Sequence, residues 1–217
     1  MGVHIVLASS SPRRKEFLEK LGFSVKAIPS TVSEERLPDE TPENYVKRLA
    51  RDKALNVVNR IRQTSYDPGP ARVSRVTGKV QDEPLRWVIG ADTVVVLGTQ
   101  VLEKPKDNLE AYEMVQSLGG REHVVITGFC IFDMKKDKEG IQAVRTHVRF
   151  KPVTKAEVEK YVAVGESLDK AGGYAIQGVG AYLVEAIEGS YTNVVGLPLC
   201  QVIQMMEEMG AHEVLPF

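Results

Sequence analysis

The stretch HIVLASSSPRRKEFLEKLGFSVKAI, residues 4–28, decides the fold class. Its opening apolar residues predict a strand at residues 4–8, and FSVKAI predicts a second strand. Between them, Ser11 has the place of an N-cap and Pro12 that of the first helical residue, which predicts a helix. This order of strand, helix and strand indicates an α/β fold.

The helix begins with Arg13 and Arg14, where cations are unfavourable. A helix N-terminus carries partial positive charge, so a cation there costs about 0.3–1 kcal/mol. If the strand ends at a cleft, the hydroxyls of Ser9, Ser10 and Ser11, free backbone N–H groups and both guanidinium groups converge on an anion such as a phosphate chain. Two solvated arginines are the alternative. Successive helical residues point about 100° apart, so we expect Arg13 to enter the cleft and Arg14 to lie along its rim.

Composition restricts the class of protein. The chain has 217 residues, which we take as a single domain, residues 1–217. Its 28 Lys and Arg against 29 Asp and Glu leave a net charge of −1, which does not favour nucleic acid as a partner. Cys130 and Cys200 lie in apolar runs and lack metal-ligand spacing, so both are predicted to be reduced core residues. Without a leader pattern or a membrane-length apolar run, we expect no membrane contact and a cytoplasmic location.

A second, longer helix is predicted from Thr41 and Pro42, with an apolar stripe continuing to Ile61. Lys53 lies on that stripe. It either extends along its stem to water or reaches into a cleft beside the serine-arginine loop. Residues 65–85 are rich in proline and glycine without a sustained period, which predicts a surface excursion, either disordered or a hairpin.

The stretch WVIGADTVVVLGTQVLEKP, residues 87–105, predicts a buried strand, a two-residue Gly-Thr turn and a returning strand. Asp92 lies inside the buried strand. A buried carboxylate is costly unless a metal, a lysine or a reacting water compensates it, although Asp92 could also cap a strand end. Lys104 returns toward the same end of the sheet, and Glu34, after the second strand, is a further candidate for the cleft.

Further along, Asp107 is predicted to cap a helix ending at Gly119. Strands are predicted at residues 122–134 and 141–150, joined by the charged turn KKDKEG, and TKAE at residues 154–157 matches a capping box.

The region from Gly172 to Gly196 is dense in glycine, which indicates unusual backbone angles or close approach to a ligand. Asp169 and Lys170 precede it, and Gln177 stands within it among small residues. The Gln177 amide can accept from N3–H of uracil or thymine and donate to O4, a pattern that cytosine reverses. A glutamine that caps loop backbone is the alternative.

Six motifs now suggest a family: ASSSPRR, GADTVV, LEKP, GREHVVITG, LDKAGGYAIQG and IEGSYTNVVGLPL. In this order they resemble the Maf family, and in particular its branch acting on dTTP and UTP. The resemblance implies a mixed twisted sheet flanked by helices, with two lobes around a deep cleft. It also implies a divalent metal cation, Mg²⁺ or Mn²⁺, and hydrolysis of a nucleoside triphosphate between the α and β phosphates.

The resemblance also implies roles for residues. Asp92 matches the family's proton acceptor, and Arg13, Thr93 and Gln177 match its specificity positions. Asp92 and Glu34 would hold the metal. The remaining residues expected to bind substrate are Ser9, Ser10, Ser11, Arg14, Lys53 and Lys104. The chain departs from the usual motifs at Ala175 and Gly119 and in the length of the 65–85 excursion, none of which is a catalytic position.

Two rival functions are open. A nucleotide-binding regulator of cell division without catalysis would need the cationic residues and Gln177 but not a buried Asp92. A kinase or GTPase of the P-loop class would need a G-x-x-x-x-G-K-[ST] loop, which the sequence lacks. The expected partner is a nucleoside triphosphate, and a homodimer is possible.

Overall fold

The computed structural model describes residues 3–64 and 85–211. The helices are α1 (Pro12–Lys20), α2 (Pro42–Thr64), α3 (Asn108–Leu118), α4 (Lys155–Ala163), α5 (Tyr191–Val195) and α6 (Leu199–Glu208), with short 3-10 helices η1 (Ala171–Gly173) and η2 (Val179–Leu183). The strands are β1 (His4–Leu7), β2 (Ser24–Ala27), β3 (Trp87–Leu97), β4 (Gln100–Leu102), β5 (Glu122–Asp133), β6 (Lys138–Phe150) and β7 (Val184–Glu188). The excursion predicted at 65–85 lies outside the described residues except for Leu85.

The strands form one mixed sheet in the order β2-β1-β3-β5-β6-β7, with β4 paired to β3. Strand β1 pairs in parallel with β2 and β3, whereas β3, β5, β6 and β7 pair antiparallel. The α/β expectation and the mixed sheet are therefore confirmed. The division into two lobes stays a prediction.

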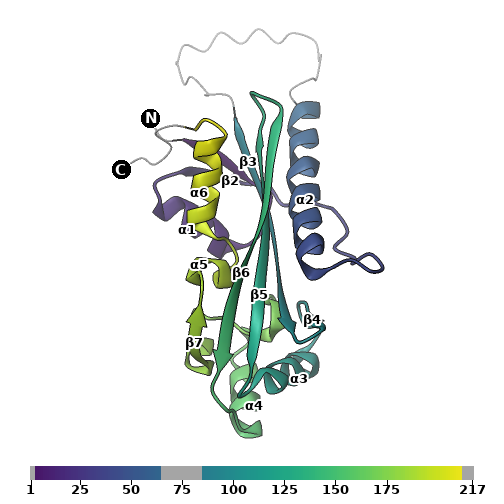
Figure 1. The fold of residues 1–217 in the computed structure, drawn as a ribbon, viewed down its shortest axis with the longest axis vertical. Coiled ribbons are helices and arrows are strands. Elements are labelled where there is room, and N and C mark those ends of the chain that lie inside the picture. Colours follow the sequence, from purple (N-terminus) through teal and green to yellow (C-terminus); the bar gives the residue numbers. More distant parts are fainter. Residues whose placement is uncertain (1–2, 65–84, 212–217) are drawn as a thin grey trace, which may run out of the picture.

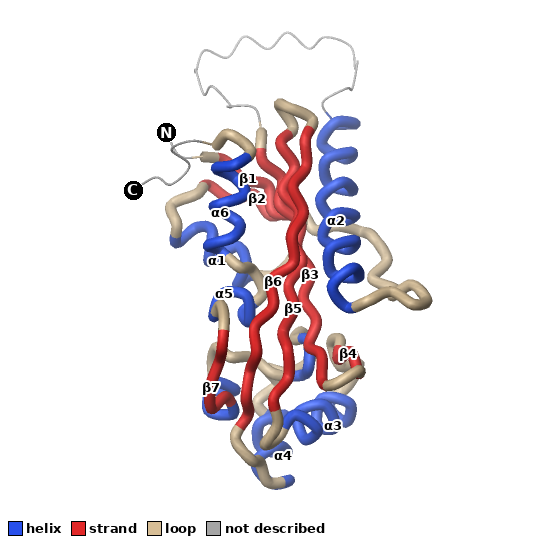
Figure 2. The backbone as a smooth tube through the Cα atoms, in the orientation of Figure 1, coloured by secondary structure: helices blue, strands red, loops and turns tan. Residues whose placement is uncertain are grey.

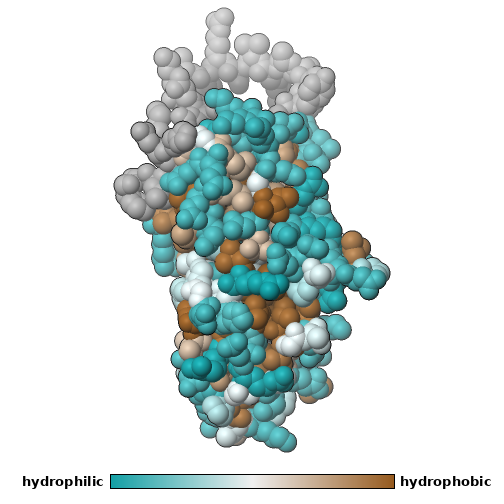
Figure 3. All heavy atoms as spheres, viewed as in Figure 1, coloured by the Kyte–Doolittle hydropathy of each residue, from teal (hydrophilic) through white to brown (hydrophobic). Residues whose placement is uncertain are grey.

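The helices cover the sheet in two places. Helix α2 lies along one face of its upper half, and α1 and α6 lie on the other side, while α3 and α4 gather at the far end of the long strands (Figures 1 and 2). Separate hydrophobic clusters lie under α1 and α6, under α2, and between α3, α4 and the strand ends. The face shown in Figure 3 is mostly hydrophilic. The site described below lies between the two groups of helices.

Two glycines let α2 lie directly on the sheet. A Cβ added to Gly90 in β3 would lie 2.2 Å from the backbone oxygen of Ala50, and one added to Gly128 in β5 would lie 2.3 Å from that of Val46. Any larger residue at either position would push the helix away. This close approach brings Lys53, on the same buried face of α2, down to the sheet.

The local signals in the sequence are confirmed. Ser11, Asp107 and Thr154 each accept a backbone N–H from the first turn of the following helix, and Glu157 completes the capping box with Thr154. The turn between β3 and β4 consists of Gly98 and Thr99, with Gly98 at a φ of 61°. These caps and turns fix where the elements begin.

One strand boundary was wrong. Strand β6 begins at Lys138 rather than at residue 141, and its first three residues pair with residues 131–133 of β5. Their side chains are charged, small or exposed, so no hydrophobic alternation marks them, and backbone pairing alone extends the strand.

The two cysteines differ in their exposure to solvent. Cys130 is buried, as expected, but Cys200 is exposed, so its assignment to the core was wrong. It lies on the outward side of α6, whose buried residues are Val202 and Met206. Within the described ranges, no helix has both the length and the apolar character that crossing a bilayer requires.

Candidate active site

A cavity of about 200 Å³ lies where β1, β3, α1 and α2 meet. Its lining includes every residue expected to bind substrate or metal: Ser9, Ser10, Ser11, Arg13, Arg14, Glu34, Lys53, Asp92, Thr93, Lys104 and Gln177. Five cationic and three acidic side chains line it, because Lys170 and Asp169 also contribute. The cavity therefore carries a surplus of positive charge on a chain whose net charge is −1.

The Arg14 side chain is held by four hydrogen bonds to other parts of the protein. Its Nε donates to the backbone oxygen of Gly196 at 2.7 Å, and its Nη1 to that of Ala91 at 2.9 Å. Nη1 also donates to Ser9 Oγ at 3.1 Å, and Nη2 to Thr93 Oγ1 at 3.0 Å. Burial lowers the pKa of the guanidinium, which the charge of Asp92 partly offsets. The rim position expected for Arg14 is wrong, because these acceptors draw the side chain inward between α1 and the sheet.

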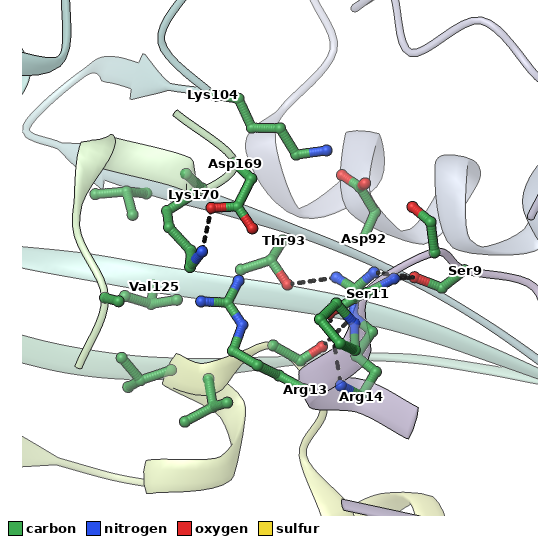
Figure 4. Close-up of a pocket in the computed structure, with 18 of the residues that line it drawn as sticks. Ser9, Ser11, Arg13, Arg14, Asp92, Thr93, Lys104, Val125, Asp169 and Lys170 are labelled. Atoms are coloured by element: carbon green, nitrogen blue, oxygen red, sulfur yellow. Dashed lines mark hydrogen bonds and ion pairs between the residues drawn. The ribbon is translucent and has the colours of Figure 1, made fainter. Parts of the chain in front are cut away.

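Arg13 differs from its neighbour. Among the described residues it forms no hydrogen bond or ion pair, and its side chain points toward Asp169 and Lys170 across the cavity (Figure 4). Burial lowers its pKa, and the negative charge of Asp169 opposes that effect. Arg13 is thus a cation in the cavity wall whose donors are free for an anionic ligand.

Two carboxylates meet on one lysine at the floor of the cavity. Lys53 Nζ lies 2.7 Å from Asp92 Oδ1 and 2.7 Å from Glu34 Oε1. Lys53 and Asp92 are buried, at 7% and 8% exposed, whereas the Glu34 side chain is half exposed. Lys53 is therefore the cation that a buried aspartate requires, and its extension to water is excluded.

The charges around Glu34 favour its ionised form. Burial alone would raise its pKa, but the hydrogen bond from Lys53 and the positive charges of Lys53, Lys104 and Arg14 hold that pKa below its usual value. Lys104 reaches the same space from beyond β4 and points toward Asp92 (Figure 4). Glu34 is consequently available as an anionic ligand at neutral pH.

Asp92 and Glu34 offer carboxylate oxygens, the kind of ligand that a divalent metal ion takes in proteins. Mg²⁺ is usually held by one or two carboxylates together with water and substrate phosphates rather than by a full protein cage. Asp92 Oδ2 has no hydrogen-bond partner among the described residues, whereas Lys53 Nζ occupies the point on which Asp92 Oδ1 and Glu34 Oε1 converge. No cluster of three or more His, Cys, Asp or Glu side chains that could hold a metal ion occurs in residues 3–64 and 85–211.

Thr93 and Gln177 come from different elements, strand β3 and the loop between η1 and η2. Thr93 Oγ1, which accepts from Arg14, also lies 2.9 Å from Thr127 Oγ1, so its rotamer is fixed by two partners. Gln177 lies on the loop between η1 and η2, and its amide forms no hydrogen bond within the described part of the chain. The backbone-capping alternative for Gln177 is therefore not favoured.

Comparison with known proteins identifies the family. A family model described as Maf-like protein matches residues 4–209. The chain belongs to the Maf family. A Maf relative from Syntrophotalea carbinolica, named dTTP/UTP pyrophosphatase, is 45% identical over 95% of this chain and 85% of its own length. Relatives of the same name from Geobacter sulfurreducens and Geotalea uraniireducens are each 44% identical, over 95% and 97% of this chain and 97% of their own lengths.

Within this Maf chain, the sequence did not predict several lining residues. Asp169 and Lys170, an ion pair, stood out as charges before the glycines but without an assigned role. Tyr174, Val95 and Val125 carried no signal, because an apolar or aromatic residue in a strand or loop looks like core until the fold exposes one side of it to a cavity.

Proposed function

We propose that this Maf chain is a nucleoside triphosphate pyrophosphatase that hydrolyses dTTP and UTP to the monophosphate and pyrophosphate. The names of the relatives support the reaction and the substrates. The observation that carries the proposal is the buried Lys53 joined to Asp92 and Glu34 on the floor of a cationic cavity. A regulator that only binds nucleotide has no use for this arrangement, so it is not favoured.

The triphosphate would lie against the cations. Arg13 and Lys104 have no partner among the described residues, so their donors are available to phosphate oxygens. Ser9, Ser10 and Ser11 add hydroxyls at the N-terminus of α1, where backbone N–H groups also favour an anion. Arg14 would act through Ser9 and Thr93, because its guanidinium holds both hydroxyls in place by hydrogen bonds.

Asp92 and Glu34 would hold a divalent cation, Mg²⁺ or Mn²⁺. When bound, the metal neutralises phosphate charge and favours attack at phosphorus. In the reaction, a water oxygen forms a bond to the α phosphorus and the bond from that phosphorus to the bridging oxygen breaks, which releases pyrophosphate. Lys53 occupies only Oδ1 of Asp92, so Oδ2 is free either to hold the metal or to accept the proton of the water.

Gln177 would read the base. The unpaired amide of Gln177 can accept from N3–H and donate to O4 of uracil or thymine, and it mismatches cytosine. A site built for such a pair rejects an analogue strongly, because a mismatch leaves buried polar groups unpaired. We propose Arg13, Thr93 and Gln177 as the residues that set specificity.

A panel assay tests this function. The protein is incubated with Mg²⁺ and each of dTTP, UTP, CTP, ATP and GTP, and pyrophosphate and orthophosphate are quantified separately. The proposal expects pyrophosphate from dTTP and UTP at rates well above those for CTP. Binding without release of either product would support the regulator instead. Cytoplasmic action and a homodimer stay proposals, the second tested by sedimentation.

A further inference from the structure

The backbone directly after Gln177 is not fixed by its own segment. Gly178, directly after Gln177, has a φ of 81°, and no side chain of its own segment caps the following helix η2. Earlier in the loop, Tyr174 and Ile176 pack into the core, but the glycine that follows Gln177 leaves its backbone conformationally free. Reading a base by paired hydrogen bonds requires a fixed amide, so the segment after Gln177 needs a restraint from another part of the chain.

Glu166 supplies one side of that constraint. Its Oε1 accepts from the backbone N–H of Val179 at 3.2 Å and its Oε2 from that of Gly180 at 3.4 Å. The carboxylate thereby caps η2 from a separate segment, at the end of a helix where an anion is favourable. A Cβ added to Gly178 would lie 2.5 Å from Glu166 Oε1, so the carboxylate packs directly against the backbone that follows Gln177.

Tyr161 supplies the other side. Its hydroxyl accepts from the backbone N–H of Ala175 at 3.1 Å, and a Cβ added to Gly180 would lie 2.8 Å from that hydroxyl. The ring is 1% exposed and belongs to the hydrophobic cluster under α3 and α4, so it offers a rigid support. The backbone is therefore held two residues before and two residues after Gln177.

We propose that Glu166 and Tyr161 are positioning residues that hold the Gln177 loop and thereby set the preference for uracil and thymine over cytosine. Neither lines the cavity, so they act through the loop rather than by touching the nucleotide. Glu166 also lies three residues before Asp169, so the same short segment supports the wall opposite Arg13. This inference rests on the proposed function.

The test compares Glu166→Gln with the control Glu159→Gln. Glutamine keeps the size of Glu166 but offers one acceptor oxygen and places an NH₂ group against the second backbone N–H. Glu159 is an exposed carboxylate of α4 with no hydrogen bond or ion pair among the described residues. A third variant, Tyr161→Phe, removes only the hydroxyl of the second support.

Three kinds of measurement are made: steady-state kinetics (kcat and KM) for UTP, dTTP and CTP, the melting temperature, and hydrogen exchange at the amides of residues 175–180. For Glu166→Gln we expect the ratio of kcat/KM for UTP to that for CTP to fall about tenfold, which equals about 1.4 kcal/mol. The loss should appear mainly in the KM for UTP. Exchange at Val179 and Gly180 should accelerate, while Glu159→Gln matches the wild type. Tyr161→Phe should accelerate exchange at Ala175 and lower the same ratio.

Separate outcomes identify which statement fails. An unchanged ratio in an active Glu166→Gln protein overturns the positioning role and leaves the proposed function standing. An equal fall in kcat/KM for all three nucleotides, caused by a lower kcat or accompanied by a lower melting temperature, also overturns it, since that pattern indicates general destabilisation. A wild-type protein that hydrolyses UTP and CTP equally refutes the proposed base preference and the inference with it. Unchanged hydrogen exchange at Val179 and Gly180 in Glu166→Gln refutes the claim that Glu166 restrains the backbone after Gln177.

Discussion

Arg13 and Arg14 are adjacent in the sequence, yet replacing them should have opposite consequences. Arg14→Met removes four hydrogen bonds, of which those to Ser9 and Thr93 end on hydroxyls that can find other partners. The bonds to the backbone oxygens of Ala91 and Gly196 have no such substitute. At about 1.5–3 kcal/mol for each hydrogen bond from a charged group, losing these two destabilises the protein by about 3–6 kcal/mol.

The variant Arg13→Met should instead preserve the fold. Arg13 has no hydrogen bond within the described residues, so its loss should change the free energy of unfolding by less than about 0.5 kcal/mol. Losing one charged contact to a phosphate should lower kcat/KM for UTP by about 10–150-fold.

Thermal unfolding followed by circular dichroism, together with kcat/KM for UTP, separates the two variants. For a domain of this size, a loss of 3–6 kcal/mol lowers the melting temperature by roughly 6–24 °C. Arg14→Met should show this drop, and Arg13→Met should melt close to the wild type. An Arg14→Met protein that melts within 2 °C of the wild type would refute the structural role of Arg14. Equal melting temperatures with equal kinetic losses would indicate that the two arginines act only as a diffuse positive charge.

Three further predictions follow from the site and the core. Asp92→Asn should lower kcat at least about 100-fold while UTP binding measured by calorimetry persists, and a near-native rate would exclude Asp92 as proton acceptor. Chelation by EDTA should abolish pyrophosphate release, Mg²⁺ or Mn²⁺ should restore it, and activity that survives chelation would contradict the metal. Burial lowers the pKa of His123 to about 4, below its value in the unfolded chain, so the unfolded state binds the extra proton and the free energy of unfolding should fall as the pH drops from 6.5 to 4. His123→Gln should flatten that dependence in urea titrations, whereas an unchanged slope would assign it to other groups.

The sequence predicted the charged residues on the floor of the cavity better than the contacts that hold the cavity walls in place. Asp92 stood out as a carboxylate in an apolar strand, and Lys53 as a lysine on an apolar stripe, because both break a hydrophobic pattern. That they form one ion pair 39 residues apart depends on the close approach of α2 to the sheet at Gly90 and Gly128.

The position of Arg14 could not be predicted from its helix alone. Its acceptors lie 77 and 182 residues further along the chain, at Ala91 and Gly196, and both are backbone oxygens with no side-chain signature. Glu166 was hidden for the same reason, since its partners are backbone N–H groups of Val179 and Gly180. Contacts between a side chain and distant backbone are determined by the tertiary fold, not by local pattern.

The exposed Cys200 has a different origin. An apolar run was assigned to the core because hydrophobic neighbours surround it, but a helix turns successive residues about 100° apart and places some of them outward. Cys200 lies on that outward side of α6.

Hydrolysis of UTP in water enriched with ¹⁸O tests the central claim most directly. The account places the attacking water at the α phosphorus beside Asp92, so mass spectrometry should find one ¹⁸O atom in each UMP and none in the pyrophosphate. Label in the pyrophosphate, or UDP and orthophosphate as products, would contradict the account.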